Sequence, residues 1–292
     1  MPSTSPATVT SVVPPTLTTG LGTGTQTVPS GSLLPDHRII SYYGHPNSAT
    51  MGILGEGTMD STLALLREQG AAFEVADPTR PVVLAFELIA TVAQVDPGND
   101  GKYIAFTGDE IIQEYLDFVT ANNLILILDI QVGLDTLPNQ IELLRKWLEY
   151  PNVHLAIDPE FSLRANEVVP RDRVPGTFIG EVSGHELNEA MLIVDQIVAE
   201  KALPAKIVIV HQFESDMIYH KDVIVVPSGI DFVLDMDGFG GAEAKVSNYG
   251  AFVRDELIEY GGIKLFYKQD DPLLTAAELV VLDPAPLVII YQ

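Results

Sequence analysis

The chain has 292 residues, of which 40 are acidic and 16 basic, so its formal net charge is −24. A surface this negative repels phosphate backbones and anionic membrane surfaces, which argues against nucleic acid as a partner. The absence of cysteine excludes disulfides, cysteine-ligated metals and thiol nucleophiles. No apolar run is long enough to span a membrane.

The first 35 residues differ from everything that follows. Residues 2–32 contain only Ser, Thr, Pro, Gly, Ala, Val, Leu and Gln, a composition that buries too little apolar surface to fold. We predict a disordered tether over residues 1–35 and one domain over residues 36–292. Such tethers commonly join an export signal or lipid anchor to an exported domain, although no signal-peptide pattern precedes this one. We therefore expect an extracellular or cell-surface protein.

Strand-like and helix-like patterns then alternate along the chain. Near-continuous Val/Ile/Leu runs separated by amphipathic helices predict a parallel sheet covered by helices. The predicted strands are residues 39–43, 82–88, 124–130, 153–157, 206–210, 231–236, 263–267 and 287–291, and the predicted helices are 58–69, 110–122, 139–149, 186–201, a shorter one near 215–223, and 247–260. Eight strands with helices between them, over about 255 residues, predict an α/β fold of the (β/α)8 TIM-barrel type, close to the roughly 250 residues typical of it. The chain stops after the eighth strand, so the eighth helix is expected to be missing, which leaves its place to the segment before the first strand or to a loop.

Most of these strands end in carboxylates, histidines or amides, as strands do where a barrel builds its active site. Side chains alternate between the two faces of a strand, so residues two apart share a face. In the fourth strand, the residues that alternate with Asp158 are apolar and suit the face covered by helices. Asp158 therefore points into the barrel. The same count predicts one ring of ionisable side chains at the barrel mouth, with His45 above the first strand: Glu87, Asp129, Asp158, His211 and Asp235. Carboxylates that converge in one cavity shift one another's pKa values.

Several of these residues also have structural explanations. Asp129 could cap a turn at its strand end, and His154 lies lower in its strand, where a core histidine is common. Asp158 and Glu160 are more informative, because Pro159 fixes the backbone between them. The run 235–241 (DMDGFGG) suits either a glycine-rich turn or a sugar-binding rim.

Known catalytic motifs are missing. The sequence has no Walker A loop, no H-E-x-x-H and no G-x-S-x-G elbow. GLGTGT at 20–25 does not follow a strand, so it fails as a dinucleotide fingerprint. The acidic loop 96–101 lacks the spaced glutamate of an EF-hand.

Five segments carry a family resemblance: SYYGHP (41–46), LDIQVG (128–133), HLAIDPEF (154–161), IVIVHQF (207–213) and DMDGFG (235–240). In these, residues 38–292 resemble an uncharacterised family of bacterial secreted or lipid-anchored (β/α)8 proteins. The resemblance implies a barrel and export but no activity. The layout is loosely similar to glycoside hydrolase barrels, many of which keep an acid/base carboxylate at the end of the fourth strand, where this chain has Asp158 and Glu160. Their second glutamate, at the end of the seventh strand, is unmatched by FYKQDD (266–271).

The leading hypothesis is a hydrolase that acts on a glycan or another small-molecule substrate and needs no cofactor. Glycosidic cleavage uses one protonated carboxyl and one ionised carboxylate. We assign the acid to Asp158 or Glu160 and the partner to Asp235 or Asp237. The predicted substrate-binding residues are His45, Glu87, Asp129, Gln131, His211 and Gln212, with Tyr43, Phe239 and Tyr267 as stacking rings.

Two alternatives remain open. The imidazole and carboxylates of His45, Glu87, Asp129, Asp158, His211 and Asp235 would also accept Zn²⁺, Mn²⁺ or Mg²⁺ in a metal-dependent hydrolase or phosphodiesterase. No H-x-H ligand pair is present, however. A barrel that binds a ligand without turning it over is the third hypothesis, favoured by the unmatched seventh-strand acid.

Overall fold

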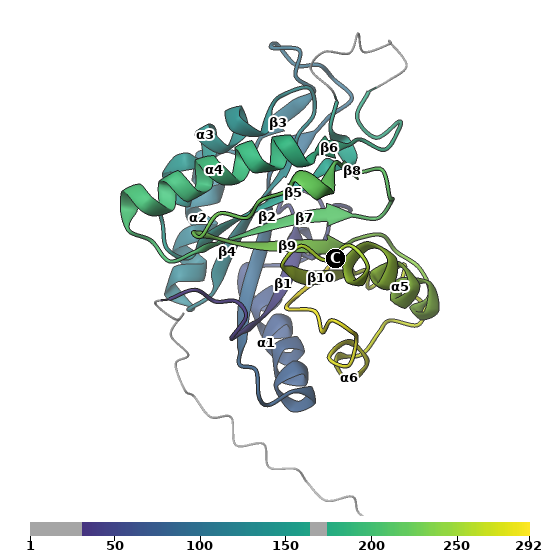
Figure 1. The fold of residues 1–292 in the computed structure, drawn as a ribbon. Coiled ribbons are helices and arrows are strands. Elements are labelled where there is room, and N and C mark those ends of the chain that lie inside the picture. The colour runs from purple at the N-terminus through teal and green to yellow at the C-terminus, as the bar shows by residue number, and fades with distance from the viewer. Residues whose placement is uncertain (1–30, 164–173) are drawn as a thin grey trace, which may run out of the picture.

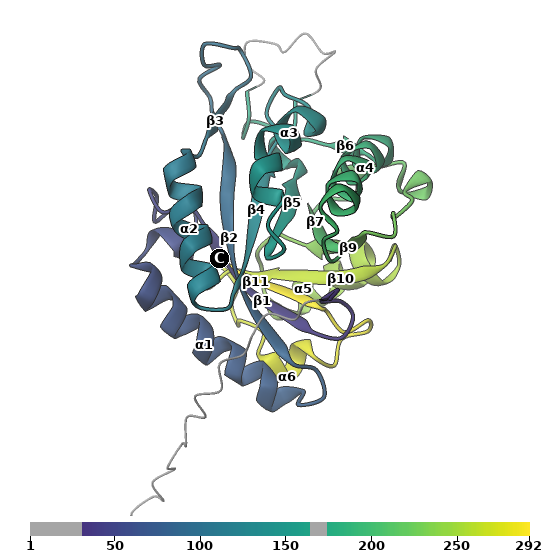
Figure 2. The ribbon, with the colours of Figure 1, turned by 90° about the vertical axis from the view of Figure 1, so that its left-hand side faces the viewer.

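The computed structural model describes residues 31–163 and 174–292 and is a closed barrel of eight parallel strands, as predicted (Figures 1 and 2). The barrel closes because β1 pairs in parallel with both β2 and β11, the last strand. The barrel strands, in order around it, are β1 (Arg38–Gly44), β2 (Val82–Ala93), β4 (Ile125–Gln131), β5 (Val153–Asp158), β7 (Lys206–Gln212), β9 (Ile230–Met236), β10 (Tyr260–Leu265) and β11 (Val288–Tyr291).

Helices between the strands cover the outside of the barrel (Figure 2). They are α1 (Met59–Ala76), α2 (Asp109–Ala121), α3 (Leu137–Leu148), α4 (Gly184–Lys201), α5 (Ala242–Tyr249), which continues as the π-helical turn Gly250–Arg254, and α6 (Ala276–Leu279). Side-chain caps start several of them: the Thr58 hydroxyl accepts from the backbone of Ser61, and Ser183 forms a capping box with Glu186. No helix in the described part of the chain is long and apolar enough to cross a bilayer.

The helix predicted near residues 215–223 is wrong. The chain instead forms β8 (Ile218–Tyr219), which pairs with β6 (Val182–Ser183), and then a 3-10 turn over Lys221–Val223. His220 takes a left-handed conformation with φ 54°, which a helix cannot contain. The stretch between the strand predicted at 82–88 and the helix predicted at 110–122 also holds a short strand, β3 (Ile104–Phe106), antiparallel to the end of β2.

The seventh barrel strand begins and ends earlier than predicted. β10 starts at Tyr260 and passes through Gly261 and Gly262. A Cβ at Gly261 would lie 2.6 Å from the Tyr249 hydroxyl, and one at Gly262 would lie 2.7 Å from Asp235 Oδ1. Close backbone approach therefore requires glycine here, although two glycines weaken the strand signal in the sequence.

The barrel interior has a mainly apolar lower half. Alternate residues of the strands, among them Ile39, Ile127, Ile207, Ile209 and Ile290, pack there with no exposed surface. Leu33 and Leu34 join this cluster at the amino-terminal end, so the segment before β1 packs into the interior and not into the outer ring. Residues 1–30, most of the predicted tether, lie outside the described residues.

Candidate active site

The upper half of the barrel interior contains ionisable side chains where the lower half has apolar ones. The five residues of the predicted ring come from five successive barrel strands, β2, β4, β5, β7 and β9, and are at most 4% exposed: Glu87, Asp129, Asp158, His211 and Asp235. Two further inward side chains complete this layer, Asp237 just after β9 and Lys264 in β10. The fold thus gathers five carboxyl groups, one imidazole and one ammonium group around the barrel axis.

His211 is the centre of the layer. Its Nδ1 lies 2.9 Å from Asp235 Oδ2, and its Nε2 lies 3.1 Å from Glu87 Oε1. Asp237 Oδ2 is 3.7 Å from Nδ1, and Asp129 Oδ1 is 3.9 Å from Nε2. Burial works against a charged imidazole, but the hydrogen bonds to Asp235 and Glu87 outweigh it and raise the pKa of His211 well above its usual range.

Lys264 is the second buried cation. Its Nζ lies 3.0 Å from Asp237 Oδ2 and 3.8 Å from the centre of the Tyr43 ring. Burial raises the pKa of Asp237, but Lys264 and then His211 more than offset this effect, so that the pKa lies below its usual value. Asp237 is therefore held ionised. Tyr43 in turn donates its hydroxyl proton to Asp129 Oδ2 at 3.1 Å.

The pKa values of three other carboxyl groups, Asp129, Asp158 and Glu160, are shifted in the opposite direction. Burial is the largest cause in each case, and it raises the pKa of Asp129 and of Asp158 to about 7. Burial, followed by the charge of Asp237, also raises the pKa of Glu160, which lies in the 3-10 turn after β5 (Pro159–Phe161). The site thus contains both proton-holding and ionised carboxyl groups near neutral pH.

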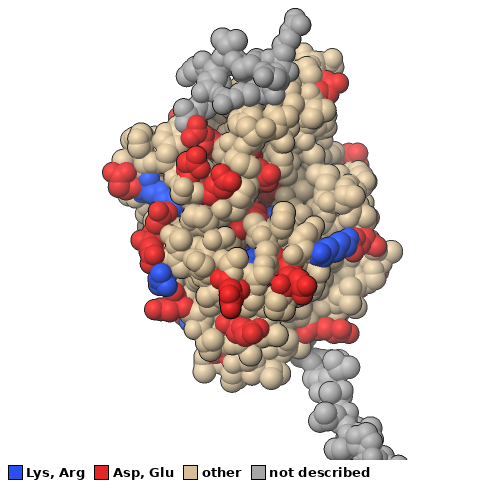
Figure 3. Space-filling model, turned by 90° about the vertical axis from the view of Figure 1, so that its right-hand side faces the viewer, with Lys and Arg blue, Asp and Glu red and all other residues tan. Residues whose placement is uncertain are grey.

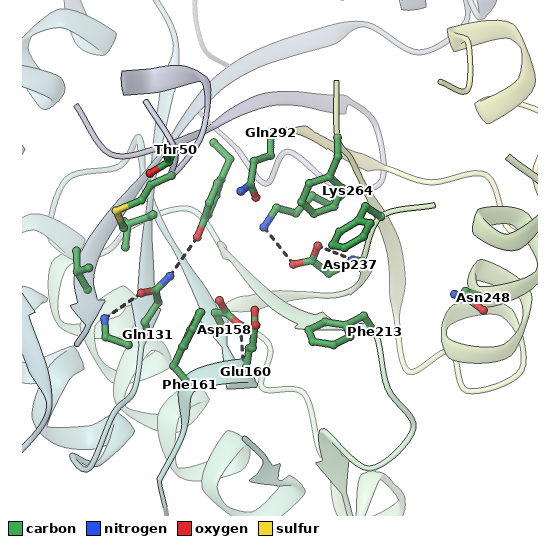
Figure 4. A pocket seen from close by; sticks show the side chains of 18 residues that line it. Thr50, Gln131, Asp158, Glu160, Phe161, Phe213, Asp237, Asn248, Lys264 and Gln292 are labelled. Carbon is green, nitrogen blue, oxygen red and sulfur yellow. Dashed lines mark hydrogen bonds and ion pairs between the residues drawn. The ribbon is translucent and has the colours of Figure 1, made fainter. Parts of the chain in front are cut away.

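A cavity of about 620 Å³ opens above this layer at the carboxyl ends of the strands. Figure 3 shows the face on which it opens, with acidic side chains around a central hollow. Asp158 and Glu160 project into the cavity from one side, and Asp237 with Lys264 from another (Figure 4). Phe161, Phe213, Phe239 and Phe266 supply aromatic rings to its walls.

The predicted site residues fall into three groups. Those that line the cavity are Tyr43, Gln131, Asp158, Glu160, Asp237 and Phe239. Those in the buried layer that do not line it are Glu87, Asp129, His211 and Asp235. Those that point elsewhere are His45, Gln212 and Tyr267.

The third group has other contacts. His45 is hydrogen-bonded to the Thr107 hydroxyl at 3.1 Å, and Gln212 bonds to the Glu214 carbonyl and to Lys221. Tyr267 stacks on Tyr291 on the outer side of the barrel. Lys264 and Phe266 line the cavity, so the alternation of side chains carries residue 267 to the outer side. His154, lower in the interior, accepts a hydrogen bond from the backbone of Ile207, as a core histidine would.

Sequence reasoning missed several cavity residues. Lys264 carried a usable signal, because a lysine two residues before Phe266 in an apolar run shares its inward face. Phe161, Phe213 and Gln292 had no such signal, since they lie just beyond strand ends, where the alternation stops. They reach the cavity through loop geometry alone.

Comparison with known proteins yields distant matches. No protein-family model matches the sequence, and no curated protein matches it significantly. Among solved structures, the chain is similar to 2,3-dimethylmalate lyase, a member of the PEP mutase/isocitrate lyase superfamily, with 12% identity over 88% of this chain and 76% of that chain and a TM-score of 0.42. It is also similar to a ruminal GH26 endo-β-1,4-mannanase, with 10% identity over 90% of this chain and 64% of that chain, less than two thirds, and a TM-score of 0.38. The assignment of the barrel rests on the strand pairing itself, and neither likeness bears on activity.

Proposed function

We propose that this protein hydrolyses glycosidic bonds, with Glu160 as the general acid and Asp237 as the ionised carboxylate. One observation carries the proposal: two carboxyl groups on the wall of one cavity have opposite surroundings. Asp237 is paired with Lys264 at 3.0 Å, whereas Glu160 has no ion pair among the described residues. Glycosidic cleavage requires this division into one proton donor and one ionised carboxylate.

The chemistry follows from the positions of the two groups. Glu160 transfers its proton to the glycosidic oxygen while the bond from that oxygen to the anomeric carbon breaks. Asp237 attacks the anomeric carbon or removes a proton from the water that does so. Lys264 keeps Asp237 ionised until it reacts.

Asp158 and Asp235 are weaker candidates for these roles. Asp158 Oδ1 accepts a hydrogen bond from the backbone of Glu160 at 3.0 Å, which makes it a positioning residue for the turn that carries Glu160. Asp235 lies beneath the cavity, bonded to His211.

Substrate binding is assigned to the apolar and amide groups of the cavity. Sugar rings present apolar faces that pack on aromatic side chains, and the four phenylalanines supply such surfaces. The amide of Gln292 is available to pair with hydroxyl groups, whereas the amide of Gln131 already accepts a hydrogen bond from the backbone of Ala93 and donates one to the Tyr43 hydroxyl. An extracellular or cell-surface location, expected from the tether, remains a prediction that localisation of the full-length protein would test.

The test compares leaving groups. Aryl glycosides and natural oligosaccharides are first screened for hydrolysis by the wild-type protein. Glu160→Gln should then lose turnover of natural linkages but retain much of its activity on dinitrophenyl glycosides, whose leaving group needs no proton. Equal loss on both substrates, or full turnover of the natural linkage, would contradict the role of Glu160.

A further inference from the structure

Three side chains directly beneath the cavity have the geometry of a metal site. Glu87 from β2, Asp129 from β4 and His211 from β7 each offer one ligand atom, and these atoms all lie within 4.8 Å of one another. All three residues are fully buried, and none of them lines the cavity. The site is therefore separate from the place where a substrate would bind.

The distances are compatible with one ion. Zinc binds imidazole nitrogen and carboxylate oxygen at about 2.0–2.2 Å, so two ligand atoms of one ion lie at most about 4.4 Å apart. His211 Nε2 is 3.1 Å from Glu87 Oε1 and 3.9 Å from Asp129 Oδ1. Only a small adjustment is needed to bring the three atoms around an ion.

An independent observation points to a ligand here. Asp129 Oδ1, the oxygen that faces His211, has no hydrogen-bond partner among the described residues, and neither does Glu87 Oε2. Buried polar atoms are normally paired, because an unpaired one keeps the cost of leaving water. A cation bound at this point would satisfy the free oxygen of Asp129 directly.

The charge of the layer favours the same conclusion. Five carboxyl groups, from Glu87 to Asp237, surround only two cationic groups, His211 and Lys264. Buried carboxylates with too few counter-charges must take up protons or bind cations. An added divalent ion would reduce the excess negative charge that these side chains carry when ionised.

We propose that Glu87, Asp129 and His211 bind a divalent transition-metal ion of the Zn²⁺ type, which fixes the floor of the cavity without touching the substrate. A mix of imidazole and carboxylate suits such ions. The hydrogen bond between His211 Nε2 and Glu87 Oε1 contains one proton, and an ion bound to both atoms displaces that proton into solvent. The proposed site has three ligands instead of the six expected from the sequence, because His45, Asp158 and Asp235 are not among them.

The experiment measures binding, not activity. Tag-free protein is unfolded and refolded in chelator to remove any ion carried over from expression. The chelator is dialysed away, and the protein is then titrated with Zn²⁺ by calorimetry in two buffers of different ionisation enthalpy. We expect one ion per chain and the release of at least one proton for each ion bound, because the ion displaces the proton shared by His211 and Glu87 and any proton carried by Asp129. Co²⁺ in place of Zn²⁺ should give visible absorption bands with an imidazole ligand. A wild-type protein that binds no Zn²⁺ and gives no Co²⁺ bands overturns the proposal, whatever the variants do.

Variants locate the site. Glu87→Gln and Asp129→Asn should each weaken Zn²⁺ binding at least about tenfold, since even supporting residues of metal sites contribute 10–100-fold. The control is Asp231→Asn, which changes a buried carboxylate at the other end of the barrel, bonded to Ser32, and should bind Zn²⁺ as the wild type does. Circular dichroism checks that each variant folds. Unchanged affinity in both folded ligand variants would also overturn the proposal, and because hydrolysis is not measured, the proposed activity stands or falls separately.

Discussion

The two halves of the barrel interior are built from the same strands but from different side chains. The lower half is packed with isoleucine, valine and alanine, whereas the upper half contains five carboxyl groups, an imidazole and an ammonium group. β9 shows the change within one strand, from Val233, packed in the lower half, to Asp235, hydrogen-bonded to His211 in the upper half. The contrast indicates that apolar packing in the lower half offsets the energetic cost of burying charged groups in the upper half.

The largest effect is expected from Asp237→Asn. The variant removes the ionised carboxylate from the cavity and should lower kcat on every glycoside substrate by about 10²–10⁴-fold or more, the range typical of acid–base groups. Steady-state kinetics on the best substrate from the screen gives the measurement.

Asp231→Asn is the matched control, because Asp231 lies near the start of β9, Asp237 lies just after its end, and both are 6% exposed. It should keep the wild-type kcat, even if its melting temperature falls. If both variants fold and lose kcat to a similar extent, catalysis does not depend specifically on the upper half of the barrel interior.

The second prediction concerns the apolar half. Ile209 is fully buried in the interior, and Ile209→Ala should reduce the free energy of unfolding by about 2–5 kcal/mol. Urea denaturation measures this loss. Leu192→Ala on the surface of α4, where the side chain is 59% exposed, should stay within about 0.5 kcal/mol of the wild type.

The third prediction is a pH dependence. Burial raises the pKa of Asp158 from 3.8 to about 7, in surroundings that also contain Glu160, Asp237, His211 and Lys264. The folded state then holds a proton that the unfolded state releases, so this group's contribution to stability is complete below its unfolded pKa and is lost as pH rises from about 4 through 7.

Asp158→Asn should remove this loss. The free energy of unfolding is measured by urea denaturation at a series of pH values. As the pH rises from about 4 to 7, the value for the variant should increase relative to that of the wild type by about a few kcal/mol. Parallel curves for the two proteins would show that Asp158 is not the group responsible.

The smallest effect is expected at the rim. The Phe239 ring is 70% exposed and lines the cavity, and stacking contributes about 0.5–1.5 kcal/mol. Phe239→Ala should therefore raise KM by about 2–12-fold with little change in kcat. Tyr267→Ala, on the outer side of the barrel, should leave KM unchanged, and a larger effect there than at Phe239 would reverse the assignment of the two rings.

Much of the fold was predictable because each strand and helix has a local cause. Continuous apolar runs such as 124–130 and amphipathic runs such as 186–201 recur in alternation, and parallel strands joined by helices close most simply into a barrel. Strand alternation also predicted which side of each strand faces inward, so Glu87, Asp129, Asp158, His211 and Asp235 were assigned correctly to one layer. The turn at His220 and the glycine-rich start of β10 were missed because they depend on contacts with distant residues.

The sequence by itself determined the eight strands, their inward faces and the collection of ionisable groups at one end, since a period of two is a property of the backbone. Only the tertiary structure decided the depth of each group: Glu87, Asp129, His211 and Asp235 beneath the cavity, and Asp158, Glu160 and Asp237 on its wall. Depth depends on strand register, on loops such as that after β5, and on the pairing of Asp237 with Lys264. These are long-range relations, and they determine which carboxyl group holds a proton and which stays charged.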